Sequence, residues 1–528
     1  MKKLTLYTIL IFGLTLSSCD KDFEEINKNP FSPTTTEIGP LFNTVISELK
    51  LGWNEQFYLH NEAVYQITQQ AALTAETFQN INIGTEEMWN QYYRRLAHIR
   101  ELERRFDAYQ GNQEALNNVR AQVKILLAYT TFRLTDIFGD IPFFDAGRGF
   151  EELEYIRPKF DRQEDIYKFL LEELAWAVEH INTYPNPETD DGTPMVSFGN
   201  FDNLLDGDMA WWVKFANSLR LRHALRMVEK APDFANPILK EIIEGNLPVI
   251  ETGEEVCMWP RRQDWLRESV NWSFREHNKL RMGSTIWHQL SENDNIDGSG
   301  IFDPRARIFF EPNNTGEWVP FPQVPDTDTP PSGGIPYERH RDNNYTVKGQ
   351  SNIYSPFNYY LIRDEKDVPE ILITAAEVQF IMAEAYARGL GVGLDTDQAN
   401  ILYNNGVVAS LTFWQNVFVN TEIWVNAPPV LTTGQIYGVA NHPRIDIFNK
   451  ENKLEYIYRQ RWIDAFRQPW EAYALLRRTR MTPHEAPLAE HYRFPYPPSE
   501  VENNPDNWAA QVSLMGADDV QTKIWWVP

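Results

Sequence analysis

Apolar side chains recur at helical spacing in segments spread over most of this chain. After Asp161 they stand at positions 166, 170, 174, 177, 178 and 181, which lie on one face of a helix. A second stripe runs through residues 378–385 until Gly389, and a third through 454–465. Glycine often ends a helix because it tolerates a left-handed backbone, and Pro469 suits the first turn of a further helix. The spacing therefore predicts a mainly α-helical protein.

Two of these stripes begin with the arrangement of a capping box, in which a short polar residue stands three positions before a glutamate. Asp161 with Glu164 and Thr374 with Glu377 have this spacing. The polar side chain of such a pair can accept a backbone N–H group at the start of a helix. Further helices are expected at about 38–51, 56–76, 84–108, 113–138, 208–230 and 396–416.

Long stretches without helical spacing separate these segments. Residues 184–194, 312–336 and 484–507 are rich in Pro, Gly, Asn and Asp, which dominate turns. Loops longer than ~15 residues are uncommon unless they are functional, so we expect these to form a ligand face or a partner contact. No composition shift marks a linker, which predicts one large unit with core helices from both ends of the sequence. The sequence shows no fixed period of about 34 residues that would by itself predict a tetratricopeptide solenoid.

The N-terminus has the pattern of an exported lipoprotein. Two lysines precede an apolar run over residues 4–16, which is shorter than the ~20 residues of a membrane-spanning helix. Leu16-Ser17-Ser18-Cys19 follows and resembles the bacterial lipobox, in which the cysteine is acylated and becomes the new N-terminus. We therefore expect a signal peptide at 1–18 and a single domain at 19–528. Several acyl chains on Cys19 would hold the protein on a membrane without a spanning helix, and a signal without lipidation is the alternative.

The charge balance excludes some partners. Loss of Lys2 and Lys3 with the signal leaves 47 basic against 74 acidic residues, a net charge of −27. Such a surface repels nucleic acid phosphates, so no nucleic acid partner is expected, and membrane contact is expected through the lipid anchor only. With Cys19 acylated, no disulfide can form within the chain, and the apolar neighbours of Cys257 predict a buried thiol.

Motifs for catalysis or cofactors are weak. Asp136 and Asp140 are a carboxylate pair, but they fit the end of a helix and the turn after it. The dipeptide at 484–485 lacks the second histidine of a metalloprotease motif. Residues 293–298 (NDNIDG) resemble the start of a calcium loop, but its twelfth position is Pro304 where a glutamate belongs. We expect no catalytic residues, no cofactor and no metal.

Aromatic residues make up 13% of the chain, with 17 Trp and 23 Tyr. Their flat rings can stack on sugar rings or peptide side chains while amides hydrogen-bond the polar edges. The candidate ligand-binding residues stand in turn-rich segments without helical spacing; they are Phe78, Asn80, Trp272, Trp318, Tyr354, Tyr359 and Tyr360. For each aromatic residue, packing in the core or anchoring of a loop is the alternative.

Blocks of sequence over nearly the whole mature chain resemble the SusD/RagB family of nutrient-binding lipoproteins, in particular its SusD-like subgroup. The blocks are 23–30 (FEEINKNP), 132–142 (FRLTDIFGDIP), 212–222 (WVKFANSLRLR), 303–305 (DPR), 374–380 (TAAEVQF), 460–462 (QRW), 470–472 (WEA), 477–479 (RRT), 493–497 (RFPYP) and 517–526 (ADDVQTKIWW). Each block alone is weakly specific, and their order along the chain carries the resemblance.

The resemblance implies a SusD-like fold, with four tetratricopeptide-like helix pairs packed against a loop-rich variable region. It implies a SusC-like, TonB-dependent outer-membrane transporter as the partner, on which the lipoprotein is a lid that holds an oligosaccharide or peptide over the pore. The acidic residues 20–25 resemble the signal that sends Bacteroidota lipoproteins to the cell surface, so the lipid-anchored protein is expected on the outer membrane, facing the exterior. The starch-gripping aromatic arc of the founding members has no residue-by-residue match here, so starch is not implied.

Two other functions remain open from the sequence. One is a surface glycoside hydrolase, which would use two carboxylates that flank the scissile bond. The other is a helical scaffold that binds only proteins. The choice between glycan and peptide as the nutrient is open as well.

Overall fold

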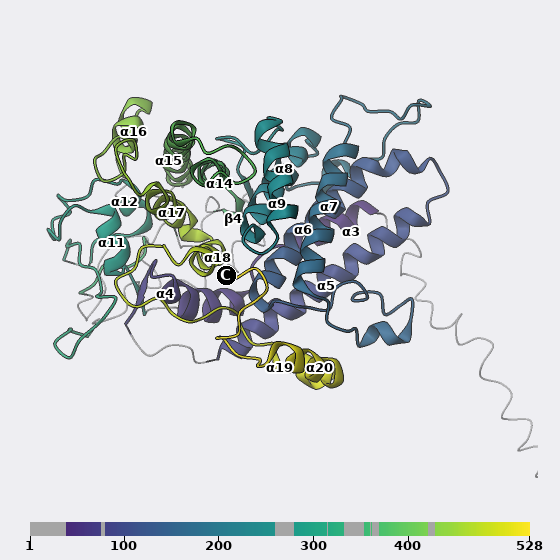
Figure 1. Cartoon of the computed structure of the whole chain (residues 1–528), viewed down its shortest axis with the longest axis horizontal. Coiled ribbons are helices and arrows are strands. Elements are labelled where there is room, and N and C mark those ends of the chain that lie inside the picture. The colour runs from purple at the N-terminus through teal and green to yellow at the C-terminus, as the bar shows by residue number, and fades with distance from the viewer. Residues whose placement is uncertain are drawn as a thin grey trace, which may run out of the picture.

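A computed structural model describes residues 38–74, 80–258, 279–313, 315–331, 353–358, 361, 369–420 and 428–528. Helices dominate these residues, as Figure 1 shows. The helices of the first half are α3 (Ile38–Ser47), the π-helix η1 (Glu55–Val64), α4 (Tyr65–Ile67), α5 (Ile81–Asp107), η2 (Gln113–Leu116), α6 (Asn117–Phe138), η3 (Leu153–Ile156), α7 (Gln163–His180), η4 (Gly199–Phe201), α8 (Met209–Met227) and α9 (Pro232–Glu244). Those of the second half are α11 (Ser284–Leu290), α12 (Arg305–Phe309), α14 (Ala375–Arg388), α15 (Thr396–Val419), α16 (Thr433–Ala440), α17 (Lys453–Asp464), η6 (Ala465–Arg467), α18 (Pro469–Thr479), α19 (Pro498–Asn503) and α20 (Pro505–Met515).

Strands are short in the part of the chain that is described. β1 (Ala72–Leu73) pairs antiparallel with β3 (Leu280–Arg281), and Ala72 lies opposite Arg281. β2 (Val256–Met258) pairs antiparallel with β4 (Glu370–Ile373), with Val256 opposite Ile373 and a register shift at Cys257. Each pair joins segments far apart in sequence, so these strands act as cross-links between helical regions.

The long helices pack as consecutive pairs. α5 lies against α6, α7 against α8, α14 against α15, and α17 against α18. The pairs also contact one another, because α6 packs on α7, α8 on α14, and α14 on α17 (Figure 1). This array confirms the expected fold class in its general form, a mainly helical arrangement of helix pairs beside a loop-rich region.

Helices from the two ends of the sequence share one core. The Tyr65 hydroxyl after η1 donates to the Phe466 carbonyl at 2.8 Å, and the Trp462 indole donates to the Thr68 carbonyl at 2.9 Å. A continuous cluster of buried apolar residues extends from Phe42 to Val527. The expectation that both ends contribute core helices is confirmed. The extent of the single domain, 19–528, includes residues outside the described ones and stays a prediction.

Local signals placed some helix ends correctly. The Thr374 hydroxyl accepts the Glu377 backbone N–H at 3.0 Å, and Gly389 has a φ of 69° just after α14. The expected cap at Asp161 is wrong. Its carboxylate instead accepts the backbone N–H groups of Phe143 and Phe144, each at 2.9 Å. The first N–H of α7 is bound by Asp140, 23 positions upstream, at 2.8 Å.

The helix expected at 56–76 is wrong over residues 68–74, and residues 75–76 lie outside the described part of the chain. α4 ends at Ile67, and Gln69 has a left-handed backbone with a φ of 57°. The buried Gln69 and Gln70 side chains donate to the carbonyls of Ala486 and Trp462, at 2.8 and 2.7 Å. These hydrogen bonds to residues far away in the sequence turn the chain toward β1. The spacing of neighbouring residues gives no sign of this turn.

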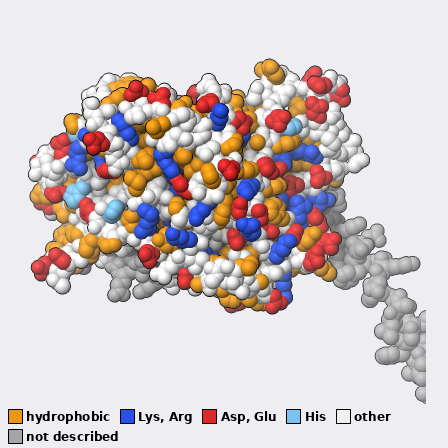
Figure 2. All heavy atoms as spheres, viewed as in Figure 1, with side chains coloured by type: hydrophobic (Ala, Val, Ile, Leu, Met, Phe, Trp, Pro, Cys, Tyr) orange, Lys and Arg blue, Asp and Glu red, His pale blue; other side chains and the backbone are white. Residues whose placement is uncertain are grey.

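Other expectations concern the surface and the thiol. Cys257 is buried in β2, as its apolar neighbours predicted. On the face in Figure 2, acidic and basic side chains are interspersed with apolar ones. Within the described residues, no helix has the length and apolar character needed to cross a membrane.

Candidate functional site

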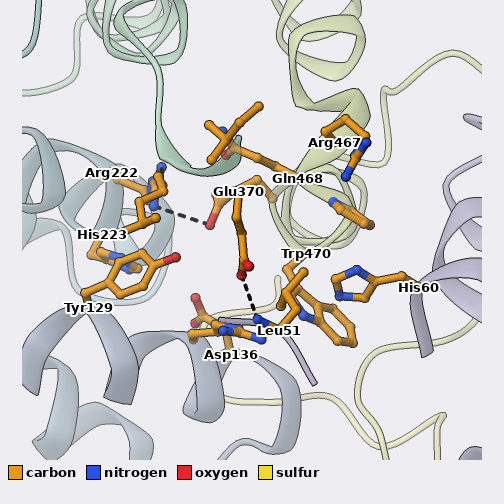
Figure 3. Close-up of a pocket in the computed structure, with 15 residues that line it drawn as sticks. Leu51, His60, Tyr129, Asp136, Arg222, His223, Glu370, Arg467, Gln468 and Trp470 are labelled. Atoms are coloured by element: carbon orange, nitrogen blue, oxygen red, sulfur yellow. Dashed lines mark hydrogen bonds and ion pairs between the residues drawn. The ribbon is translucent and has the colours of Figure 1, made fainter. Parts of the chain in front are cut away.

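Perturbed titratable groups surround a small cavity where α6, α8, β4 and the start of α18 meet (Figure 3). The Glu370 carboxylate points into it from β4, and its Oε1 accepts the Leu51 backbone N–H at 2.8 Å. Arg222 of α8 donates to the Leu372 carbonyl at 2.9 Å. His60 and Trp470 enter from η1 and α18 with their rings edge to face at 4.8 Å. Five separate stretches of sequence therefore build this cavity; they are 51–60, 129–136, 222–223, 370–372 and 467–471.

Ion pairs neutralise most of the charge around the cavity. Arg222 donates to Glu377 at 3.0 Å, and Arg226 pairs with both Asp136 and Glu471. Burial by itself would raise the pKa of Glu471, but Arg222 and Arg226 outweigh it and lower that pKa to about 2. Glu471 therefore stays ionised at neutral pH.

For Glu370 and His60, burial affects the pKa more than the neighbouring charges do. It raises the pKa of the Glu370 carboxyl to about 7, although Arg133 opposes this. It also lowers the pKa of the His60 imidazole to about 3, so the imidazole is neutral at physiological pH. At neutral pH the cavity thus holds a neutral imidazole and a partly ionised carboxyl, beside paired charges that line the same space.

The cavity is too small for a sugar ring. Its volume is about 60 Å³, against roughly 300 Å³ or more for small-molecule pockets. Four polar atoms that line it have no hydrogen-bond partner among the described residues; they are Glu370 Oε2, His60 Nε2, His223 Nδ1 and Gln468 Nε2. Unpaired polar atoms around a space of this size suit a few buried waters. We interpret the residues around this cavity as structural, because the space is too small for a sugar ring.

Replacing Glu370 by glutamine is expected to stabilise the protein at pH 8 by roughly 1–3 kcal/mol. Glutamine keeps an acceptor for the Leu51 N–H but carries no charge. The folded protein holds the Glu370 proton more tightly than the unfolded chain, so this residue's contribution to stability is present below about pH 4.5 and falls as pH rises toward 7. His60 has the opposite effect on stability, because folding lowers its pKa from 6.5 to about 3. Its contribution to stability therefore rises with pH over that range.

The measurement is therefore the difference between variant and wild type in urea unfolding at pH 5 and pH 8. The difference is expected to be larger at pH 8. Glu451→Gln, at an exposed site, is the control and is expected to give no such difference. An equal effect of Glu370→Gln at both pH values contradicts the assignment.

The residues expected to bind ligand are only partly described. Phe78, Trp272, Tyr359 and Tyr360 lie outside the described residues, as does Cys19. The other three are placed as follows. Asn80 is exposed just before α5, with a left-handed φ of 69°. Trp318 is 5% exposed and stacks on Trp287 with ring centres 6.0 Å apart, and Tyr354 is 4% exposed. Burial leaves Trp318 and Tyr354 little ring surface for a ligand.

The segments that carry these residues converge in space. Thr74 stands just before residues 75–79, and Lys279 stands just after residues 259–278. The Thr74 N–H donates to the Lys279 carbonyl at 3.0 Å. The Met282 N–H donates to the Ser355 carbonyl at 2.9 Å, and the Ser355 N–H donates to the Val319 carbonyl at 2.8 Å. We call the described residues 72–74, 279–284, 318–323 and 353–357 the four-segment junction. Stretches as far apart in sequence as 72–74 and 353–357 thus meet at one place on the molecule.

Polar side chains that the sequence did not single out lie beside this junction. The Ser284 N–H donates to the Phe321 carbonyl at 2.9 Å, and the Ser284 hydroxyl contacts Glu485. His288, on the same helix, is 42% exposed and lies between Glu485 and Asp294, with its Nε2 3.1 Å from the Asp294 carboxylate. Histidine atoms are visible in Figure 2 at the end of the molecule where Figure 1 places α11 and α12. No local pattern could have grouped these residues, because Glu485 comes about 200 positions after His288.

The segment with weak calcium-loop character is folded on itself. The Asn295 N–H donates to the Asn293 side chain at 3.0 Å, and the Ser299 N–H donates to the Asp297 carboxylate at 2.8 Å. Over the described part of the chain, no group of three or more His, Cys, Asp or Glu residues is arranged to hold a metal ion.

Comparisons with known proteins agree with this architecture. A family model described as "Starch-binding associating with outer membrane" matches residues 29–497. A solved chitin-binding protein is 22% identical, with a TM-score of 0.70 over 93% of this chain and 100% of that one. A SusD homolog from Parabacteroides distasonis is 19% identical, with a TM-score of 0.69 over 93% and 98%. A SusD-like protein from Bacteroides thetaiotaomicron is 20% identical, with a TM-score of 0.65 over 93% and 99%. No curated protein sequence matches significantly.

Proposed function

Because this chain belongs to the SusD-like family of starch-binding proteins that associate with the outer membrane, we propose that it is a surface lipoprotein that captures a glycan nutrient. In this proposal Cys19 carries the lipid, and the protein faces the cell exterior. It delivers the glycan as a lid to a SusC-like TonB-dependent transporter and performs no chemistry on it. The family description favours glycan over peptide as the ligand class.

One observation carries the placement of the ligand. The hydrogen bonds of the four-segment junction join the borders of the segments that hold Phe78, Trp272, Tyr359 and Tyr360. A binding platform for a chain of sugars needs several aromatic rings on one surface, with hydrogen-bonding groups beside them. We place the glycan at this junction, with the exposed side chain of His288 among the polar groups near it.

Substituting two platform residues together, Trp272→Ala and Tyr360→Ala, is expected to weaken glycan binding by roughly 100-fold, because two stacked rings are lost. Titration calorimetry with soluble starch and with chitin oligosaccharides measures the affinity. The melting temperature is expected to stay nearly unchanged.

Tyr184→Ala is the matched control, because that ring is 78% exposed and lies outside the four-segment junction. It is expected to bind like the wild type. Unaltered affinity of the double variant would remove these residues from the site. Release of sugars from a polysaccharide by the purified protein would point to a hydrolase instead.

A further inference from the structure

The buried amide of Gln69 joins a distant irregular segment and α11 through four hydrogen bonds. Its Oε1 accepts the backbone N–H groups of Glu485 and Ala486, at 2.9 and 3.1 Å, and its Nε2 donates to the Ala486 carbonyl at 2.8 Å. The Thr285 hydroxyl of α11 donates to the same Oε1 at 3.0 Å. In Figure 1 the segment after α18 runs beside α4 and α11, as these contacts require. A single side chain that is 2% exposed therefore fixes the backbone of residues 485–486.

The backbone of Gln69 has a conformation that glutamine rarely adopts. Its φ is 57°, in the left-handed region, where a residue with a Cβ costs free energy. Glycine would avoid that cost but has no amide, and asparagine tolerates the region but carries its amide one methylene closer to the backbone. The structure thus combines a strained turn with an amide that reaches residues 485–486. Strained residues of this kind are typical of ligand clamps.

The segment that Gln69 holds carries a carboxylate into contact with the four-segment junction. The Glu485 Oε2 accepts the hydroxyl of Ser284, which belongs to the junction and itself accepts the Gln323 N–H at 2.9 Å. The Glu485 Oε1 contacts Nδ1 of His288. These contacts lie at the surface, because Glu485 is an exposed residue with a side chain that is 34% exposed. The buried amide and the surface carboxylate therefore belong to one hydrogen-bond network.

A fixed carboxylate at this place suits the recognition of sugar hydroxyls. An ionised carboxylate only accepts hydrogen bonds and offers about four lone pairs. Ser284 and His288 use two of those of Glu485, which leaves acceptor capacity for donors on a ligand. A sugar hydroxyl can donate to this acceptor, and a hydrogen bond to a charged acceptor is stronger than one between neutral groups. Holding the carboxylate in place beforehand reduces the cost of ordering it when a glycan binds.

We propose that Glu485 is a glycan-binding residue and that Gln69 is its positioning residue. This inference rests on the proposed capture of a glycan at the four-segment junction, and it adds an acceptor for the sugar hydroxyls there. It also gives a function to part of the turn-rich segment 484–507, for which the sequence predicts a ligand face or a partner contact.

Titration calorimetry with soluble starch and with chitin oligosaccharides, on the full-length protein in detergent, provides the test. Glu485→Gln and Gln69→Met are each expected to weaken binding about 10-fold, because the first removes an acceptor and the second its placement. The double variant is expected to bind as Glu485→Gln does, since Gln69 acts through Glu485. Gln163→Met is the control, because it removes a fully buried amide that donates to the Thr135 carbonyl in a part of the fold that contributes nothing to the junction. It is expected to lower the melting temperature and leave the affinity unchanged.

A spectroscopic measurement separates positioning from stability. Because Nδ1 of His288 contacts Glu485, Gln69→Met is expected to shift the imidazole NMR signals of His288 in the sugar-free protein, and Gln163→Met is not. His288→Asn assigns these signals by their loss. Gln69→Asn suits the left-handed backbone and provides a second variant, with the same expected results, if Gln69→Met does not fold.

The outcomes distinguish this inference from the proposed function. Unchanged affinity of Glu485→Gln, in a protein whose wild type binds either probe, overturns the inference and leaves the proposed function standing. Unchanged affinity or unmoved His288 signals in the Gln69 variant overturn the positioning, as does a further 10-fold loss in the double variant. A wild type that binds neither starch nor chitin oligosaccharides contradicts the proposed capture and this inference together.

Discussion

Replacing Glu384 by alanine is expected to lower the free energy of unfolding by about 3–5 kcal/mol. Glu384 is 0% exposed in α14 and accepts two hydrogen bonds from Arg478 of α18, each at 2.6 Å. It also accepts from the Tyr458 hydroxyl of α17 at 2.9 Å. Burial would raise the pKa of Glu384, but Arg478 and its neighbours lower it to about 2, so the residue is charged whenever the protein is folded near neutral pH. Its removal leaves the Arg478 guanidinium buried with no carboxylate to balance it.

The chain offers a matched control on the same arginine network. Arg388 pairs with Glu384 and also with Glu229, which is 39% exposed. Glu229→Ala is expected to cost at most about 1 kcal/mol, because solvent screens an exposed pair. Urea unfolding at pH 7 measures both variants. A double replacement, Glu384→Leu with Arg478→Met, is expected to recover most of the lost stability, since an apolar pair avoids the buried charge. Equal costs for Glu384→Ala and Glu229→Ala would show that the buried network is not what joins these three helices.

Replacing Cys19 by serine is expected to move nearly all of the protein from the membrane fraction to the soluble fraction. The proposed anchor is acyl chains on the Cys19 thiol, and serine cannot take the thioether-linked lipid. A mature chain with a net charge of −27 has no compensating attraction to anionic lipid, so no second contact with lipid is expected to retain it. The shift is measured in cells without the proposed transporter, because the transporter would otherwise hold the protein at the membrane. Cell fractionation with immunoblotting measures the shift, and mass spectrometry of the wild type detects the lipid.

The other cysteine of the chain is the control. Cys257 is buried in β2, so Cys257→Ser is expected to leave membrane attachment intact even if it lowers stability. Retention of the Cys19→Ser protein on membranes after a high-salt wash would contradict the proposed anchor. The circular dichroism of the released protein is expected to match that of the wild type, because the anchor takes no part in the helical core.

Helix positions were largely predictable because the forces that set them act within a few residues. The stripe in α14 and its ends at Thr374 and Gly389 are local, and the structure confirms all three. The start of α7 was misassigned because Asp140, a distant residue, binds its first N–H while Asp161 holds another loop. The segment after α4 was misassigned for the same reason, since Gln70 bonds to a carbonyl 392 positions away.

The site was harder to predict than the fold. The segments around Trp318 and Tyr354 lack helical spacing, which predicted exposed rings that bind ligand. Both rings are instead buried in the loop-rich region. A loop with a buried aromatic ring and a loop with an exposed one look alike in the sequence, because neither requires apolar residues at a regular spacing.

The sequence by itself determined the helical stripes, the lipobox pattern and the acidic balance, because each depends on neighbouring residues or on composition alone. Only the tertiary structure decided which segments meet. The Thr74 hydroxyl donates to the carbonyl of Lys279, 205 positions away, and Glu384 pairs with Arg478, 94 positions away. Such pairings depend on how the helices pack into one core, and no spacing between neighbouring residues encodes that packing.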